Sequence, residues 1–341
     1  MAINGVVHAG FSSEWGIVGE PTAIGEAAFG TANATTAACE KFDCAIPSNI
    51  DHGLFRDISV KHGDGRMANV SNDYVSAKGG LRVIPFSDMI VRQKDLGALL
   101  YAVTQVMDEG ETPFEKSCTL TTATTQPDFS ADAGFFATIG IKDTIASYHR
   151  MYYGCILRTL TLSSDLTGDG LLRASGEWIT GFPESTTTNF TSGTWAFNTQ
   201  AYYDFHVTPT KKIAGTDIVL YGFDITINNN AVRIGDTGAT GNPETYGLGR
   251  YDITGNIKCK FDVATQGMFA AEIAGTDVAI QLACGTDGAA GNFDFTGSGC
   301  LLDGVGDDYE NAAGRALDIP FTATSSAIFT CTDGLDRAWP T

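Results

Sequence analysis

A chain of 341 residues is long enough to bury about three quarters of its surface, in one large domain or two modest ones. Its formal net charge of −19 disfavours a protein that wraps nucleic acid, because such proteins place lysine and arginine on the phosphates. Forty glycines and only 18% charged residues are typical of an all-β protein, and no apolar run is long enough for a membrane-spanning helix.

The N-terminal 36 residues are rich in glycine, alanine and threonine and show little periodicity. An arm of this kind becomes ordered only when it docks on another surface. Its aromatic residues Phe11 and Trp15 are the predicted docking anchors, on this subunit or on a neighbour, and we assign both to inter-subunit contacts. The first residues lack a basic region followed by an apolar one, so no secretory signal peptide is expected there.

Alternating apolar and polar residues predict short strands along most of the chain. An early strand pair is expected within residues 74–86, broken at Gly79 and Gly80 and ending near Pro85. Residues 253–261 also alternate cleanly, and the pattern assigns the inward face to Ile253, Ile257, Cys259 and Phe261. In residues 218–227 the pattern assigns to one face Val219, Tyr221, Phe223, Ile225 and Ile227. Further strands are predicted at residues 54–62, 114–125, 135–145, 278–283, 293–295, 317–321 and 327–331.

One helix is predicted, over residues 95–107. Its apolar residues recur at helical spacing on one face, at Leu96, Leu99, Leu100, Val103 and Met107. Asp95 is the expected N-cap, because its carboxylate can accept the free amide hydrogens of the first turn. Gly110 and Pro113 are expected to end the helix, which would cover a sheet face.

Residues 148–182 read as one long β-hairpin, around which the rest of the chain is organised. Its first arm alternates between Cys155, Leu157, Thr159 and Thr161 on one face and Ile156, Arg158, Leu160 and Leu162 on the other. Serine, aspartate and glycine in residues 163–170 supply the turn. The returning arm places Leu172, Ala174 and Trp178 on one face and Arg173, Ser175 and Glu177 on the other.

These patterns predict a mainly β fold of two packed antiparallel sheets, as a sandwich or half-barrel, with one flanking α-helix and the long hairpin. No stretch has the length and composition of a linker between independent domains. We therefore expect an arm of residues 1–36 that docks between subunits, followed by one β domain of residues 37–341 with loop insertions.

Catalytic and nucleotide-binding motifs are absent from the sequence, including the nucleophile elbow, the zinc-protease helix motif and the phosphate-binding loop. The five histidines have no partner at a useful local spacing. We therefore expect no enzyme, no catalytic residue and no cofactor. A hydrolase whose residues come together from distant parts of the chain is the least favoured alternative.

Two acidic stretches resemble metal sites in part. Asp165, Thr167, Asp169 and Gly170 match the first positions of a calcium loop, but Gly176 stands where the bidentate glutamate should be. Aspartate and glycine are also what a hairpin turn requires, so the turn is favoured over a metal site. A cation remains an open alternative at the acidic loop of Asp303, Asp307, Asp308 and Glu310.

The eight cysteines are expected to be reduced and buried, because several lie inside apolar alternations and no signal peptide is recognised. Cys39 and Cys44 have the wrong spacing for a zinc knuckle and lack a second matching pair. No metal site is assigned.

Several runs of the sequence resemble the major tail tube proteins of long-tailed bacteriophages. The central hairpin carries the resemblance in residues 153–162 (YGCILRTLTL) and 170–176 (GLLRASG). Other matching runs are residues 95–100 (DLGALL), 224–230 (DITINNN), 249–257 (GRYDITGNI) and 317–323 (LDIPFTA). The similarity covers most of residues 40–330 and consists of packing patterns without a chemical signature.

This resemblance implies a structural subunit with two packed antiparallel sheets and a flanking helix. Subunits of this family close into hexameric rings that stack into a hollow tube, through which genomic DNA passes without specific binding. Expected partners are copies of the chain itself and the tape measure, terminator and distal tail proteins. The implied location is the virion tail, assembled in the host cytoplasm, with no membrane contact.

Within such a tube, Arg158, Arg173 and Glu177 are predicted to lie away from the core, near subunit contacts. The main alternative is a β-sandwich module of a virion or secreted protein that binds carbohydrate or a cell surface. Such a module needs a cluster of exposed aromatic residues, whereas Trp15, Trp178, Trp195 and Trp339 are dispersed along the sequence.

Overall fold

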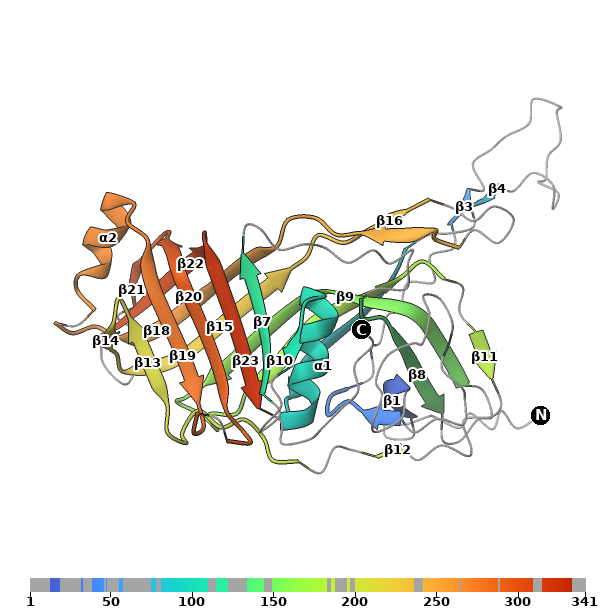
Figure 1. The fold of residues 1–341 in the computed structure, drawn as a ribbon, viewed down its shortest axis with the longest axis horizontal. Helices are drawn as coiled ribbons and strands as arrows, with labels where there is room; N and C mark the ends of the chain where they lie inside the picture. The colour runs from blue at the N-terminus through green and yellow to red at the C-terminus, as the bar shows by residue number, and fades with distance from the viewer. Residues whose placement is uncertain are drawn as a thin grey trace, which may run out of the picture.

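A computed structural model describes most of the chain from Ser13 to Thr332. The described residues are 13–18, 32, 39–45, 47, 55–57, 75–77, 81–109, 115–121, 134–143, 149–182, 185–187, 195–196, 200–235, 242–263, 265–287, 289–308 and 315–332. They form an elongated, mainly antiparallel β structure with two helices, α1 (Gln93–Thr104) and α2 (Met268–Ala274) (Figure 1). The predicted mainly β fold is confirmed, and α2 is a second helix that the periodicity did not indicate.

The strands follow one another along the chain in mostly antiparallel pairs. In order they are β1 (Ser13–Val18), β2 (Cys39–Lys41), β3 (Phe55–Asp57), β4 (Val75–Ala77), β5 (Arg82–Ile90), β6 (Asp108–Glu109), β7 (Glu115–Thr121), β8 (Ala137–Asp143), β9 (His149–Asp165), β10 (Arg173–Thr180), β11 (Ser185–Thr187), β12 (Trp195–Ala196), β13 (Thr210–Ile213), β14 (Thr216–Asp217), β15 (Leu220–Asn228), β16 (Val232–Ile234), β17 (Thr245–Gly247), β18 (Asp252–Lys260), β19 (Val278–Cys284), β20 (Phe293–Leu302), β21 (Gly306–Asp308), β22 (Ala316–Ala323) and β23 (Ser326–Thr332).

Strand β9 joins two parts of the largest sheet. Its first residues pair with β8 and β11, and β8 in turn pairs with β1. Its later residues pair with β10 on one edge and β15 on the other, from which the sheet continues through β18 and β22 to β20. The predicted hairpin is therefore confirmed as β9 and β10, and it is the element that connects the two parts of the fold.

A bulge in β9 changes which side chains face the core. Thr159 pairs with Glu177 and Leu157 pairs with Trp178, so Arg158 is an extra residue without a partner in that ladder. An extra residue moves all preceding side chains to the opposite face. Leu157 and Leu160 consequently lie in the same buried cluster, and the strict alternation predicted for this arm is wrong.

The same displacement occurs in β15. Its pairing with β18 shifts between Leu220 and Gly222, so Tyr221 is the extra residue. Leu220 and Phe223 are both buried, while Val219 is 50% exposed. The predicted face is therefore correct from Phe223 onward and wrong before it. The inward face predicted for residues 253–261 is confirmed by the buried Ile253, Ile257 and Cys259.

Helix α1 begins two residues earlier and ends three residues earlier than expected. Its N-cap is Arg92, and Asp95 lies inside the first turn, where Oδ2 accepts a hydrogen bond from the Arg92 backbone amide at 3.3 Å. The predicted N-cap was therefore wrong. Gln105 takes a left-handed conformation that ends the helix, and its side chain holds Phe135 through Oε1 and Nε2.

Replacing Asp95 with alanine should destabilise the subunit by about 1 kcal/mol, because the Arg92 amide at the buried start of α1 loses its acceptor. Chemical denaturation of the purified variant measures this. An exposed substitution such as Ser87→Ala is the control and should change the free energy of unfolding by less than about 0.5 kcal/mol. Equal stability of Asp95→Ala and wild type would contradict the assignment.

Strand β5 runs through Pro85 to Ile90, so the predicted end near Pro85 is wrong. Among the described strands, β5 pairs with β10 alone, which leaves its second edge without a strand partner. Proline lacks an amide hydrogen and is tolerated on an edge strand, where one ladder of hydrogen bonds is missing.

The core is continuous from the N-terminal strands to the C-terminal ones. Helix α1 packs in it against β7, β9, β15 and β23. Trp178 and Tyr152 are fully buried there. All eight cysteines are thiols outside any disulfide, and all but the half-buried Cys44 are buried.

Candidate assembly surfaces

A row of hydroxyl side chains crosses five neighbouring strands on the outer face of the sheet. Direct cross-strand pairing places side by side Ser175 of β10, Thr161 of β9, Thr226 of β15, Thr254 of β18 and Thr322 of β22. The Oγ1 atoms of Thr161 and Thr226 are hydrogen-bonded at 2.8 Å. Among the residues that alternate with this row, Leu162 and Ile225 are fully buried and Ile253 and Phe321 are nearly so. We call this surface the hydroxyl face.

Charged side chains on the hydroxyl face are largely engaged by neighbouring groups. Arg158 and Glu177 form an ion pair at 2.5 Å, with about a third of each side chain exposed (31% and 38%). Asp224 accepts a hydrogen bond from the Asn256 amide at 2.7 Å. Burial nevertheless raises the pKa of Asp224, although that hydrogen bond acts to lower it.

Arg173 connects the hairpin tip to the edge strand β5. Its guanidinium contacts Asp169 in the tip at 2.7 Å and Asp88 of β5 at 2.8 Å. The hydrogen bond from Arg173 holds the pKa of Asp169 below its usual range. The structure thus places Arg158, Arg173 and Glu177 together on the outer side of the hairpin, and their role in subunit contacts stays a prediction.

The carboxylates of the calcium-loop-like tip are occupied by the turn itself. Asp165 Oδ1 accepts hydrogen bonds from the Thr167 amide at 2.9 Å and the Thr167 hydroxyl at 2.6 Å. The bond from the hydroxyl is the main cause of the lowered pKa of Asp165. Asp169 Oδ1 accepts the Leu171 amide at 3.1 Å. This geometry is an aspartate turn.

Of the two predicted aromatic anchors, Trp15 lies in the core of its own subunit and Phe11 lies outside the described residues. The Trp15 ring is 2% exposed, its centroid is 4.6 Å from that of Phe42, and Nε1 donates a hydrogen bond to the Cys44 carbonyl at 3.3 Å. Trp15 therefore anchors β1 within this subunit. A contact of either residue with a neighbour stays a prediction.

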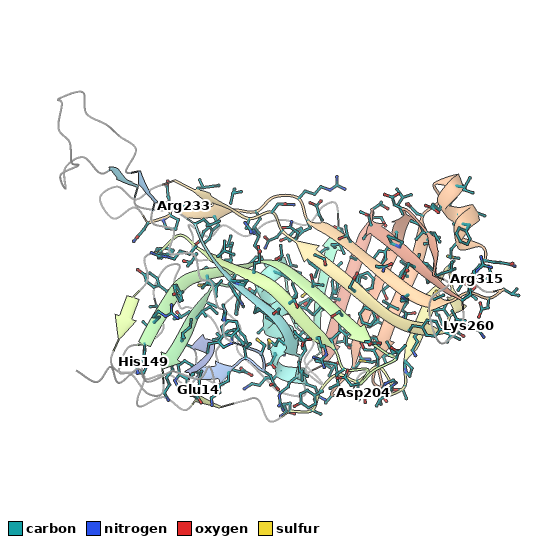
Figure 2. All side chains as sticks on the ribbon, turned by 180° about the vertical axis from the view of Figure 1, so that it is seen from behind. Glu14, His149, Asp204, Arg233, Lys260 and Arg315 are labelled. Carbon is teal, nitrogen blue, oxygen red and sulfur yellow. The ribbon has the colours of Figure 1, made fainter. Side chains whose placement is uncertain are left out.

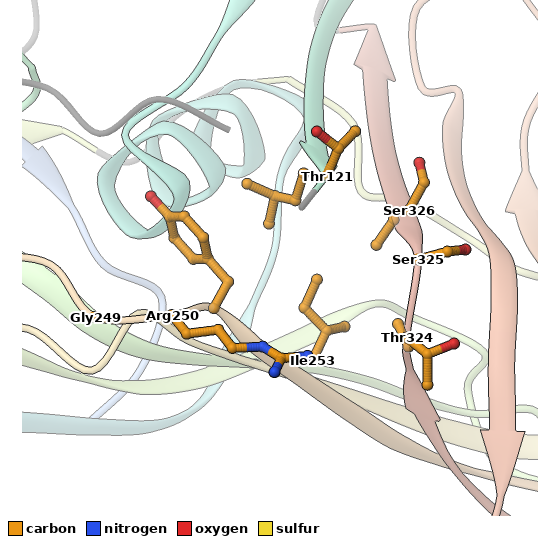
Figure 3. A pocket seen from close by; sticks show the side chains of 11 residues that line it. Thr121, Gly249, Arg250, Ile253, Thr324, Ser325 and Ser326 are labelled. Carbon is orange, nitrogen blue, oxygen red and sulfur yellow. The ribbon is translucent and has the colours of Figure 1, made fainter. Parts of the chain in front are cut away.

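A cleft of about 420 Å³ opens between the ends of β7 and β22 and the segment before β18. Figure 3 shows Arg250 and the hydroxyl groups of Thr121, Thr324 and Ser326 around it. Among the described residues, no histidine, cysteine or carboxylate lines this cleft.

The described part of the chain holds neither a cluster of metal-binding side chains nor a helix long and apolar enough to cross a membrane. There, no three histidine, cysteine or acidic residues are grouped to hold a metal ion. The two described helices are both too short to cross a bilayer. The side chains of Asp307 and Asp308, and all of Glu310, lie outside the described residues, so the predicted cation alternative is not tested.

Among the described residues, the molecule is a β-protein whose sheet has a buried core on one side, a polar outer face on the other and an edge strand, β5, with one strand partner. The particular kind follows from comparison with protein families: a family model described as phage tail tube protein matches residues 7–323. The chain belongs to this family, so its role is structural and its place is the phage tail. Among curated proteins, none matches the chain significantly.

Alternation along the hairpin predicts that Arg158, Arg173 and Glu177 lie outside the core, but no local pattern predicts the hydroxyl face. That face depends on which residues of five strands lie opposite one another, and strand register across separate segments is not encoded in any local pattern. The frequent threonines at outward-facing strand positions are the one feature of the sequence that points to the hydroxyl face.

Proposed function

We propose that this chain closes into hexameric rings that stack into the hollow tail tube, with the hydroxyl face lining the channel for DNA. The observation that carries the proposal is the hydroxyl face itself, because an extended sheet with a dry core on one side and hydroxyls on the other suits a water-filled wall.

Among the described strands, the second edge of β5 has no strand partner, and this supports closure between copies. An unpaired strand edge in a soluble protein invites pairing with another strand, and a barrel built from several chains removes such edges. The tube would thus be completed by hydrogen bonds between subunits. The arm of residues 1–36, with Phe11, is part of the same proposal as a docking element.

Passage of DNA without binding follows from the charge of the surface. The hydroxyls of the row are neutral, Arg158 on the same face is paired with Glu177, and the net charge of −19 repels the duplex as a whole. The tape measure, terminator and distal tail proteins are the proposed partners at the ends of the tube, with assembly in the host cytoplasm.

Reversing the charge at Arg173 should weaken assembly at least tenfold while costing the isolated subunit no more than about 1 kcal/mol. A glutamate at this position would stand beside two carboxylates, those of Asp88 and Asp169, and would push β5 and the tip apart. Sedimentation velocity measures assembly of Arg173→Glu, and denaturation measures its stability. Lys212→Glu, on the separate strand β13, is the charge-matched control.

If Arg173→Glu assembles as well as wild type, the proposal that Arg173 lies near a subunit contact is wrong. The proposal as a whole is tested by negative-stain imaging of the purified protein at high concentration. Hollow stacked rings are expected. A protein that stays monomeric, with or without other tail components, would count against it.

A further inference from the structure

Strand β9 changes partners at a glycine in its interior (Figure 1). Up to Cys155 its partners are β8 and β11, and from Ile156 onward they are β10 and β15. Gly154 takes a left-handed conformation, with φ of 57°, and the pairing with β8 shifts register at the same place. Strands that pass from one sheet to another commonly do so through a bulge or bend of this kind. We call residues 153–155 the β9 bend.

The β9 bend has no room for a side chain at its centre. A Cβ atom added to Gly154 would lie 2.4 Å from two carbons of the Phe182 ring. The centroid of that ring is 5.1 Å from the centroid of the Tyr153 ring. The Phe182 carbonyl accepts a hydrogen bond from the buried Arg82 guanidinium. Phe182 is therefore held against the bend through both its ring and its backbone.

One buried hydroxyl ties the β9 bend to the chain beside it. Tyr246 of β17 is 4% exposed, and its hydroxyl donates a hydrogen bond to the Gly154 carbonyl at 2.9 Å and accepts one from the Gly181 amide at 2.8 Å. The last pair in the ladder between β9 and β10 is Ile156 with Ile179. The hydroxyl thus bridges the two chain segments just beyond the point where their strands part.

The Tyr246 ring has a second, separate task, which is to hold the β16–β17 hairpin on the sheet. It packs in a small buried cluster with Phe136, Ile156, Ile179 and Ala231. This packing depends on the ring, whereas the bridge depends on the hydroxyl. Tyr246→Phe therefore keeps the packing and loses only the bridge, so the two tasks can be told apart.

The β9 bend lies between two regions that the proposed function assigns to subunit contacts. On one side is β5, whose second edge has no strand partner among the described strands, and on the other is β1, which continues the N-terminal arm. Figure 2 shows Glu14 of β1 and His149, where β9 begins, toward one end of the molecule, and Lys260, where β18 ends, toward the other. A contact between different surfaces closes into a ring only when the rotation from copy to copy fits. The angle of β9 at the bend contributes to that rotation.

We propose that Tyr246 is a positioning residue for assembly. Its hydroxyl fixes the angle of the β9 bend, and this angle sets the relative orientation of the two contact regions and so the number of copies that close one ring. The inference rests on the proposed function and names a residue on which its ring geometry depends. Tyr246 needs no contact with another copy for this role.

Removal of the hydroxyl from the full-length chain tests the bridge and its consequence. In Tyr246→Phe the Gly181 amide loses its acceptor and should exchange its hydrogen about tenfold faster, as measured by mass spectrometry on the peptide that contains it. In negative-stain class averages, the share of rings with the wild-type number of copies should fall by about half or more, with open arcs or rings of other sizes in their place.

Two further variants separate the bend from a general loss of stability. Tyr203→Phe is the matched control, because Tyr203 is fully buried and its hydroxyl donates a hydrogen bond to the Gln93 carbonyl at 3.0 Å. It should form rings of the wild-type size. Gly154→Ala changes the bend itself, because the added methyl group would overlap the Phe182 ring, and it should alter the ring size as Tyr246→Phe does.

Wild-type rings from Tyr246→Phe, or altered rings from Tyr203→Phe as well, would overturn this inference and leave the proposed function intact. Unchanged hydrogen exchange at Gly181 in Tyr246→Phe would overturn it too, because the bridge would then not hold the bend. Absence of rings in wild type would instead contradict the proposed function, and with it this inference.

Discussion

Replacement of Asn229 with alanine is expected to lower the free energy of unfolding by about 3 kcal/mol, a large effect for one polar side chain. Asn229 is fully buried, and its Nδ2 donates hydrogen bonds to the carbonyls of Val103 in α1 and Leu157 in β9, both at 2.9 Å. Oδ1 accepts the Ala231 amide at 3.1 Å. The substitution would leave these backbone groups buried without partners.

Chemical denaturation of the purified variant measures this loss. Asn228→Ala is the matched control, because Asn228 is partly exposed and accepts one local hydrogen bond, from the Asn230 amide. Its cost should stay below about 1 kcal/mol. Equal effects at the two positions would show that the link between α1 and β9 does not depend on Asn229.

The subunit is expected to lose stability steeply as the pH rises above 9. Burial raises to about 12 the pKa of four fully buried thiols, those of Cys118, Cys259, Cys284 and Cys300, from 9.0. The folded state therefore holds these protons more tightly than the unfolded state. Their stabilising effect is complete below pH 9 and is lost as the pH rises toward 12.

The loss of stability at high pH is large because all four thiols lower the free energy of unfolding as they ionise. Each thiol should cost roughly 1.4 kcal/mol at pH 10, so the group should cost several kcal/mol relative to pH 8. Unfolding free energies measured in denaturant at pH 8, 9 and 10 test this. Cys259→Ala should be less stable at pH 8 but show a shallower fall with pH, whereas a flat profile for wild type would contradict the burial of the thiols.

Local patterns were sufficient to predict the strands but not their irregularities. The alternation predicted for residues 253–261 matches the structure because β18 has no bulge before Cys259 that would move its side chains to the other face. In β9 and β15 the extra residues Arg158 and Tyr221 move the preceding side chains to the other face. A bulge is a property of the pairing between two strands, so neither strand reveals it alone.

For the candidate assembly surfaces, the sequence predicts which side chains lie outside the core but not which other side chains they contact. Alternation predicts Arg173 outside the core, but its ion pair with Asp88 depends on β5 lying beside β10. Trp15 is predicted to be a docking anchor on this subunit or a neighbour; it packs on Phe42 of its own subunit, and a contact with a neighbour stays a prediction. Helix α2 is only 7 residues long, which is too short for a clear helical period.

An electron cryo-microscopy reconstruction of the assembled protein tests the central claim most directly. We expect a hollow tube with Thr161, Thr226 and Thr254 on the channel wall and the core packed behind them. A reconstruction in which the hydroxyl face is covered by protein, or in which the copies do not enclose a channel, would contradict it.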